Sequence, residues 1–117
     1  MDHSPHILPH FLHEKLGEIT ELCEKHKLRR LWVFGSVIRS DFDQDSDIDL
    51  LYEMDDANIL PEESYQWFWG FYDSMRSFLD RPLDMVWYQG IRNPYFKAEV
   101  DETKLLIYDK RGEKVSV

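Results

Sequence analysis

Apolar residues recur every three to four positions in two long stretches of the chain, which predicts two amphipathic helices. The first helix is expected over residues 10–26, with a stripe formed by Leu12, Leu16, Ile19 and Cys23. The second is expected over residues 62–79, directly after Pro61, a residue that favours the first turn of a helix. Its stripe comprises Tyr65, Phe68, Tyr72, Met75 and Leu79.

The second helix carries a further apolar line on another face, formed by Trp67, Phe71 and Phe78. A helix that is apolar around so much of its circumference is either deeply buried or shared with a partner. The sequence leaves both interpretations open.

Short apolar segments bounded by turn residues predict four strands: "RLWVFG" (30–35), "SDIDLLYEM" (46–54), "PLDMVWY" (82–88) and "KLLIYD" (104–109). A brief helix or turn is expected at residues 36–41, and a short helix opened by Asn-Pro at residues 93–102. This order predicts an α/β (α+β) fold, in which a small mixed sheet is flanked by helices on one face. We expect a single domain over residues 1–117, with its packed core between about residues 10 and 109.

Composition narrows the classes of partner. The 117 residues are 43% hydrophobic, enough to bury a core, and the net charge of −9 argues against nucleic acid because phosphate binding needs clustered Lys and Arg. A single cysteine, Cys23, cannot form an internal disulfide. No apolar run approaches the roughly 20 residues that cross a bilayer, and the N-terminus lacks the pattern of a signal peptide. These features predict a cytoplasmic protein without a membrane partner.

Two aspartates interrupt the strand at residues 46–54. Because side chains alternate along a strand, Asp47 and Asp49 share one face, while Ile48, Leu50 and Tyr52 occupy the other. Two carboxylates about 6 to 7 Å apart at their backbones repel each other and resist burial unless a cation lies between them. Mg²⁺ favours such oxygen ligands.

A third acid, Asp84, interrupts the apolar strand at residues 82–88. If that strand pairs beside residues 46–54, Asp84 faces Asp47 and Asp49. Three such carboxylates can hold two Mg²⁺ ions about 3.5 to 4 Å apart, as in phosphoryl or nucleotidyl transfer. A lone Asp-x-Asp is more often a solvated strand end. The hypothesis of a metal site therefore depends on finding Asp47 and Asp49 together with a third acid in a later strand and a Gly-Ser turn. In contrast, we expect Asp41, Asp43 and Asp45 to lie in a loop and face solvent.

The Gly35-Ser36 pair, directly after a strand, completes the candidate site. Glycine lets the backbone approach phosphate oxygens, and Ser36 offers an amide and a hydroxyl. Arg39 adds a cation for the same phosphates. We therefore expect Gly35, Ser36 and Arg39 to bind the triphosphate of a nucleotide.

These residues carry a family resemblance. Gly35-Ser36, followed after ten residues by Asp47-Ile48-Asp49, resembles the G-S-x10-D-x-D pattern of the DNA polymerase beta-like nucleotidyltransferase superfamily, and the short chain is similar to its minimal nucleotidyltransferases, the MNT proteins. Asp84 matches the third catalytic acid of that superfamily. The resemblance implies the polymerase beta-like palm fold, Mg²⁺ at Asp47, Asp49 and Asp84, and transfer of a nucleoside monophosphate to a hydroxyl with release of pyrophosphate.

The resemblance also implies a partner, because many MNT proteins act as antitoxins of HEPN ribonuclease toxins, in some cases by transferring AMP to a toxin tyrosine. It therefore predicts a protein adenylyltransferase that uses ATP and two Mg²⁺ ions to modify a HEPN-type toxin. One alternative is a non-catalytic antitoxin that blocks the toxin by binding. Another is a transferase for a small hydroxylated molecule.

Two weaker patterns remain. Histidines recur at helical spacing and suggest zinc, but prolines interrupt any helix there, which argues against the site: His3, His6, His10 and His13. Four aromatic residues near Asp84 suit either stacking on a nucleobase or core packing, with the core favoured: Trp87, Tyr88, Tyr95 and Phe96.

Overall fold

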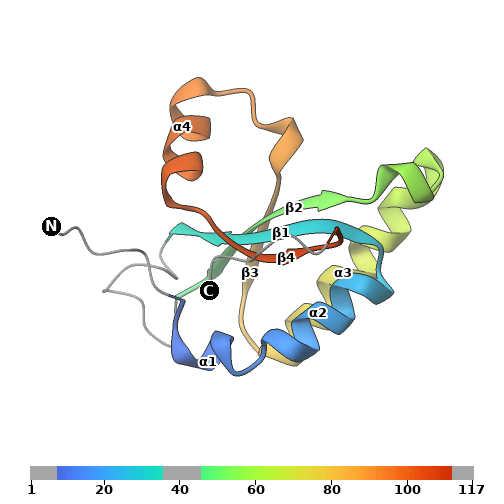
Figure 1. Cartoon of the computed structure of the whole chain (residues 1–117), viewed down its shortest axis with the longest axis horizontal. Helices are drawn as coiled ribbons and strands as arrows, with labels where there is room; N and C mark the ends of the chain where they lie inside the picture. The colour runs from blue at the N-terminus through green and yellow to red at the C-terminus, as the bar shows by residue number, and fades with distance from the viewer. Residues whose placement is uncertain (1–7, 36–45, 112–117) are drawn as a thin grey trace, which may run out of the picture.

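The computed structural model describes residues 8–35 and 46–111. Over these ranges the chain forms a four-stranded mixed sheet in the order β3-β2-β1-β4 (Figure 1). Its strands are β1 (Leu28–Phe34), β2 (Ile48–Met54), β3 (Leu83–Trp87) and β4 (Leu105–Asp109). β1 pairs antiparallel with β2 and β4, whereas β2 and β3 run parallel. The predicted mixed sheet, including the pairing of the two acid-bearing strands, is confirmed.

The first predicted helix is two helices in the structure, α1 (His10–His13) and α2 (Leu16–Lys25). Between them, the Lys15 amide donates to the carbonyl of Leu12, three residues back, and Lys15 has φ −99° and ψ 3°. The expectation of one continuous helix over residues 10–26 is therefore wrong, because this tight turn redirects the chain. Leu12, Ile19 and Cys23 of the predicted stripe are nevertheless buried.

The helix α3 (Ser64–Leu79) follows a 3-10 turn, η3 (Pro61–Glu63), and α4 (Pro94–Thr103) precedes β4. The side chain of Asn93 caps α4 by accepting hydrogen bonds from the amides of Tyr95 and Phe96, as expected for a helix opened by Asn-Pro.

Helices cover both faces of the sheet. The α2 and α3 side buries Leu31 and Val33 of β1, while Trp32 and Phe34 pack with Val100 of α4 on the other side. Figure 1 shows α4 on the opposite side of the sheet from α2 and α3. The expectation that helices lie on one face is wrong, because β1 is apolar at consecutive positions and both of its faces must be covered.

The helix α3 is deeply buried along only part of its length, and its sharing with a partner stays a prediction. Phe71, Met75 and Leu79 are buried against the sheet, yet Tyr65 is 70% exposed and Trp69 is 41% exposed near the start of the helix.

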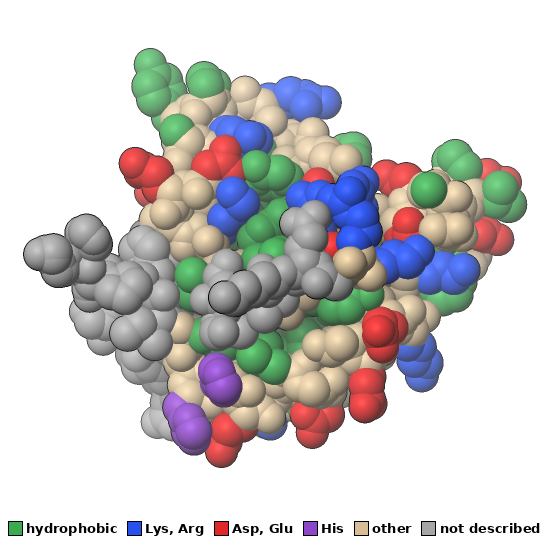
Figure 2. Space-filling model, in the orientation of Figure 1, with side chains coloured by type: hydrophobic (Ala, Val, Ile, Leu, Met, Phe, Trp, Pro, Cys, Tyr) green, Lys and Arg blue, Asp and Glu red, His purple; other side chains and the backbone are tan. Residues whose placement is uncertain are grey.

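Acidic side chains occur in several places on the surface (Figure 2). On the face shown in Figure 2 some of them lie over α2, where Glu18, Glu21 and Glu24 are exposed. Within residues 8–35 and 46–111, no helix combines the length and apolar character needed to cross a bilayer.

Candidate active site

Asp49 of β2 and Asp84 of β3 are direct neighbours in the parallel register of the sheet. Neighbouring strands lie about 4.8 Å apart, and residues in register project to the same side. Leu51 and Val86, two positions further along each strand, pack in the cluster beneath α4. Both acids therefore belong to the α4 face of the sheet.

Asp47 lies just before β2, two residues from Asp49, and strand alternation keeps it on the same side. Asp47 and Asp84 are exposed and Asp49 is half-buried, whereas Ile48 and Leu50 are fully buried on the opposite face. The predicted strand, charged on one face and anchored on the other, is confirmed.

Gly35 directly follows β1 and lies beside Asp49. Its φ is +73°, in the left-handed region that favours glycine. A β-carbon at this position would lie 3.1 Å from Cγ of Asp49 and would overlap its carboxylate oxygen Oδ2. The backbone at Gly35 therefore leaves no room for a side chain beside Asp49, and the role of Gly35 in binding phosphate stays a prediction.

The predicted metal site at Asp47, Asp49 and Asp84 is not tested by the structure. Among the described residues, no group of three or more His, Cys, Asp or Glu side chains is arranged to hold a metal ion. The roles of Asp47, Asp49 and Asp84 as metal ligands therefore stay predictions. Their chemistry suits Mg²⁺, since all three supply hard carboxylate oxygens, and two of them lie side by side.

Several predicted positions lie outside the described residues. They include the phosphate-binding candidates Ser36 and Arg39 and the loop acids Asp41, Asp43 and Asp45. The expected turn at residues 36–41 and two of the four histidines, His3 and His6, also lie outside.

The four aromatic residues near Asp84 divide into two pairs. Tyr88 and Phe96, the latter a residue of α4, pack against the cluster between α4 and the sheet. Their ring centroids lie 5.0 Å from Trp32 and 6.1 Å from Phe34, respectively, so core packing is confirmed for them. Trp87 is 48% exposed and Tyr95 is 85% exposed, so the expectation of core packing is wrong for these two.

A polar network that the sequence analysis did not identify fastens α4 to the turn after β3. The Tyr88 hydroxyl donates to Asp101 at 2.6 Å, and the ammonium groups of Lys97 and Lys104 lie 3.0 and 2.9 Å from the same carboxylate. The pKa of Asp101 is held well below its usual value. The largest cause is the hydrogen bond from Tyr88, and the next is the hydrogen bond from Lys104. The spacing of four residues between Lys97 and Asp101 on α4 was the available signal.

Known proteins resemble this chain over most of its length. The family profile described as "Polymerase beta, Nucleotidyltransferase" matches residues 17–113. A Methanocaldococcus jannaschii protein described as "Putative protein adenylyltransferase MJ1379" is 30% identical over 101 residues, which cover 80% of this chain and 96% of the relative. A second protein of that organism, "Putative protein adenylyltransferase MJ0128", is 33% identical over 87 residues, 74% of this chain and 82% of the relative.

Solved structures of nucleotidyltransferases and of toxin-antitoxin complexes share the fold of this chain. A protein described as "Structure of putative minimal nucleotidyltransferase" superposes with a TM-score of 0.65 and 25% identity, covering 86% of this chain and 97% of its own. A toxin-antitoxin structure with AMP-PNP shares the fold, with a TM-score of 0.59 and 20% identity over 82% of this chain and 74% of its own. The chain therefore belongs to the polymerase beta nucleotidyltransferase family, as one of its minimal members, and is a nucleotidyltransferase.

Proposed function

We propose that this chain is the antitoxin of a toxin-antitoxin pair, which transfers AMP from ATP to a tyrosine hydroxyl of a HEPN-type ribonuclease toxin. The observation that carries the proposal is the pairing of Asp49 with Asp84 on the α4 face, beside the close backbone approach of Gly35. Support for a protein acceptor comes from the similar proteins described as protein adenylyltransferases, and support for a toxin from the toxin-antitoxin structures with the same fold.

In the proposed reaction, the tyrosine oxygen forms a bond to the α-phosphorus of ATP while the bond between the α-phosphorus and the bridging oxygen of the β-phosphate breaks. Pyrophosphate leaves with that oxygen. Asp84, placed at the edge strand and exposed, accepts the proton of the tyrosine hydroxyl. Gly35 and Ser36 hold the β- and γ-phosphates through their amides, and Arg39 contributes a positive charge to the same phosphates.

Asp47, Asp49 and Asp84 are the residues that would hold two Mg²⁺ ions. When bound, Mg²⁺ neutralises the leaving phosphates and favours the ionised form of the attacking hydroxyl. The contribution of the chain is to keep three carboxylates on one face of a rigid sheet, so that little reorganisation is needed when the nucleotide binds. In this proposal the reaction takes place in the cytoplasm, where ATP is available. Residues 1–117 form the single domain that carries it out.

The proposal is tested by incubating the purified chain with ATP, MgCl₂ and a purified HEPN-type toxin, and measuring the intact mass of the toxin. We expect whole AMP units to be added and peptide mapping to locate them on a tyrosine. Asp49→Asn should abolish the modification. Asp73→Asn, the same change at an exposed position of α3, should retain it.

A non-catalytic antitoxin is a second candidate, favoured by the exposed aromatic residues Tyr65 and Trp69 of α3, which suit protein docking. The same variants separate the two functions. Toxin that is neutralised equally by the wild-type chain and by Asp49→Asn, with no gain in mass, would replace catalysis by complex formation.

A further inference from the structure

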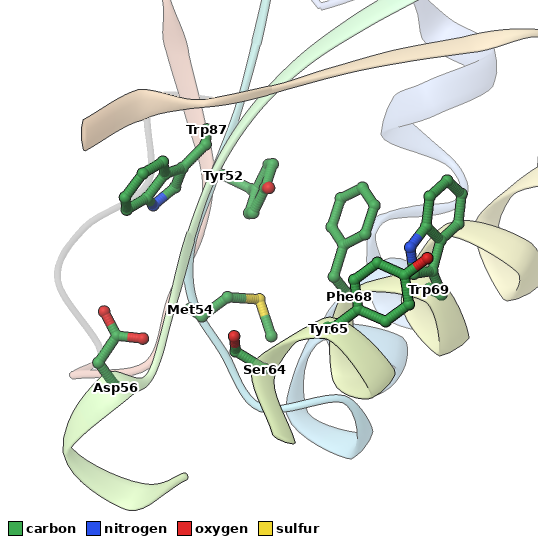
Figure 3. Close-up of a pocket in the computed structure, with 8 residues that line it drawn as sticks. All are labelled: Tyr52, Met54, Asp56, Ser64, Tyr65, Phe68, Trp69 and Trp87. Carbon is green, nitrogen blue, oxygen red and sulfur yellow. The ribbon is translucent and has the colours of Figure 1, made fainter. Parts of the chain in front are cut away.

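An open pocket of about 410 Å³ lies between the start of α3 and the ends of β2 and β3. Figure 3 shows that aromatic rings come from both sides, Tyr52 and Trp87 from the strands and Tyr65, Phe68 and Trp69 from the helix. The pocket also contains the carboxylate of Asp56. We call this group of six residues the aromatic pocket.

The rings of the aromatic pocket are held in place by one another. The ring centroid of Phe68 lies 5.0 Å from that of Tyr52 and 5.0 Å from that of Trp69, and Tyr65 lies 6.0 Å from Trp69. The Trp87 indole donates a hydrogen bond of 3.1 Å to Gln89. Such contacts fix the rings before any ligand arrives, which lowers the entropic cost of binding.

These rings nevertheless leave a large apolar surface in water. Tyr65 is 70% exposed, Trp87 is 48% exposed and Trp69 is 41% exposed. Contiguous apolar surface of this kind marks interaction sites. The pocket volume of about 410 Å³ exceeds what a small ion fills, so we expect a larger occupant.

Charge indicates the chemistry of that occupant. Elsewhere in the described chain, aromatic rings have a cation of their own, such as Lys27, 5.1 Å from the ring centroid of Trp67, and Lys15, 4.7 Å from that of Phe78. None of the described residues lining the aromatic pocket is Lys or Arg, and Asp56 adds a negative charge. Ring faces beside a carboxylate attract a cation.

We propose that the aromatic pocket receives an arginine or lysine side chain of a partner protein. The net charge of −9 on the chain favours a basic partner. Tyr52 lies on the face of β2 opposite Asp49, and Trp87 lies on the face of β3 opposite Asp84. A partner can therefore dock here while the candidate active site stays open to nucleotide. This inference does not depend on adenylyl transfer.

The test uses the full chain with ¹⁵N-labelled tryptophan and two short peptides, acetyl-Gly-Arg-Gly-amide and its analogue with neutral citrulline in place of arginine. We expect the arginine peptide to bind about fivefold more tightly, as a cation over exposed rings implies. The indole NMR signals of Trp69 and Trp87 should shift on titration. The signal of Trp32, which is buried beneath α4 on the other face, should not shift.

Variants make the assignment specific. Trp69→Leu keeps an apolar side chain but removes the ring, and Asp56→Asn removes the charge, so each should reduce the preference for arginine over citrulline toward unity. Asp73→Asn, on α3 but outside the pocket, should leave the preference unchanged. Thermal unfolding checks that each variant folds. If Trp69→Leu does not fold, the result for Asp56→Asn decides the test.

Equal affinity for the two peptides would overturn the proposal. So would binding of tetramethylammonium to the pocket without any preference for the arginine peptide, because the occupant would then be a small free cation. Self-association that Trp69→Leu and Asp56→Asn both abolish, measured by light scattering, would also overturn it in favour of a second copy of this chain.

Discussion

A β-carbon at Gly35 would overlap the carboxylate of Asp49, so that any larger residue at position 35 would displace the acid. Gly35→Ala adds a β-carbon 3.1 Å from Asp49 Cγ and forces alanine into a left-handed backbone conformation. We expect the variant to lose about 1 to 3 kcal/mol of stability and nearly all transferase activity, since the acid moves. Chemical denaturation and pyrophosphate release measure the two effects.

Gly17→Ala is the matched control for this substitution. Gly17 lies in α2, and a β-carbon there meets nothing within 4 Å. Alanine at this position should stabilise the chain by up to about 1 kcal/mol and leave activity unchanged. Wild-type activity in Gly35→Ala would show that the close approach to Asp49 has no catalytic role.

Asp84 is the candidate acceptor for the proton of the attacking hydroxyl, whereas Gly35, Ser36 and Arg39 hold the phosphates in our proposal. Asp84→Asn should therefore lower kcat by at least about 100-fold, the range for loss of a general base. Nucleotide affinity should change much less. Titration calorimetry with a non-hydrolysable ATP analogue, beside steady-state kinetics, separates these effects. A loss of nucleotide binding as large as the loss of kcat would assign Asp84 to binding instead.

Arg30 lies between two buried acids on the α4 face of the sheet. Its Nε is 3.6 Å from Glu53 Oε1 and 3.2 Å from Asp109 Oδ2, and the side chains of Glu53 and Asp109 are 9% and 0% exposed. Arg30→Met leaves both carboxylates buried without this cation, which should cost about 3 to 5 kcal/mol of unfolding free energy.

Urea denaturation measures that loss, and Arg76→Met, at an exposed position in the last turn of α3, is the control. The control should change stability by less than about 0.5 kcal/mol. Similar small losses in both variants would mean that the buried acids find other partners.

His26 should make stability depend on pH near neutrality. It packs edge-on against Phe71, with ring centroids 6.2 Å apart, and burial, followed by the charge of Lys25, lowers the pKa of the imidazole below 6.5. The folded state thus favours the neutral ring, so its stabilisation is complete above the unfolded pKa and is lost as the pH falls below it. The free energy of unfolding should decrease between pH 7.5 and pH 5.5.

His26→Gln removes the titrating group and should flatten that part of the pH profile. His10→Gln is the control, because His10 lies on the surface beside Glu14. A wild-type profile that does not fall between pH 7.5 and pH 5.5 would contradict the assigned role of His26.

Local sequence patterns predicted most helices and strands, because side-chain alternation and helix-start residues act within a few positions of the chain. Alternation in "SDIDLLYEM" placed Asp47 and Asp49 opposite Ile48 and Leu50, and the structure agrees. Pro61 and Asn93 marked the approach to α3 and α4. The break at Lys15 was missed because the apolar period of three to four residues continues through it.

The sequence by itself determined which residue types were available for chemistry: a glycine after a strand, and three acids in strands that are otherwise apolar. Tertiary structure decided that Asp84 lies beside Asp49, because the register of a parallel pair depends on how β2 and β3 meet through the intervening α3. It also decided that α4 covers the acid-bearing face and that the aromatic pocket opens on the other. An amphipathic pattern shows that a helix must bury one side, but the surface that buries it is chosen only when the whole core packs.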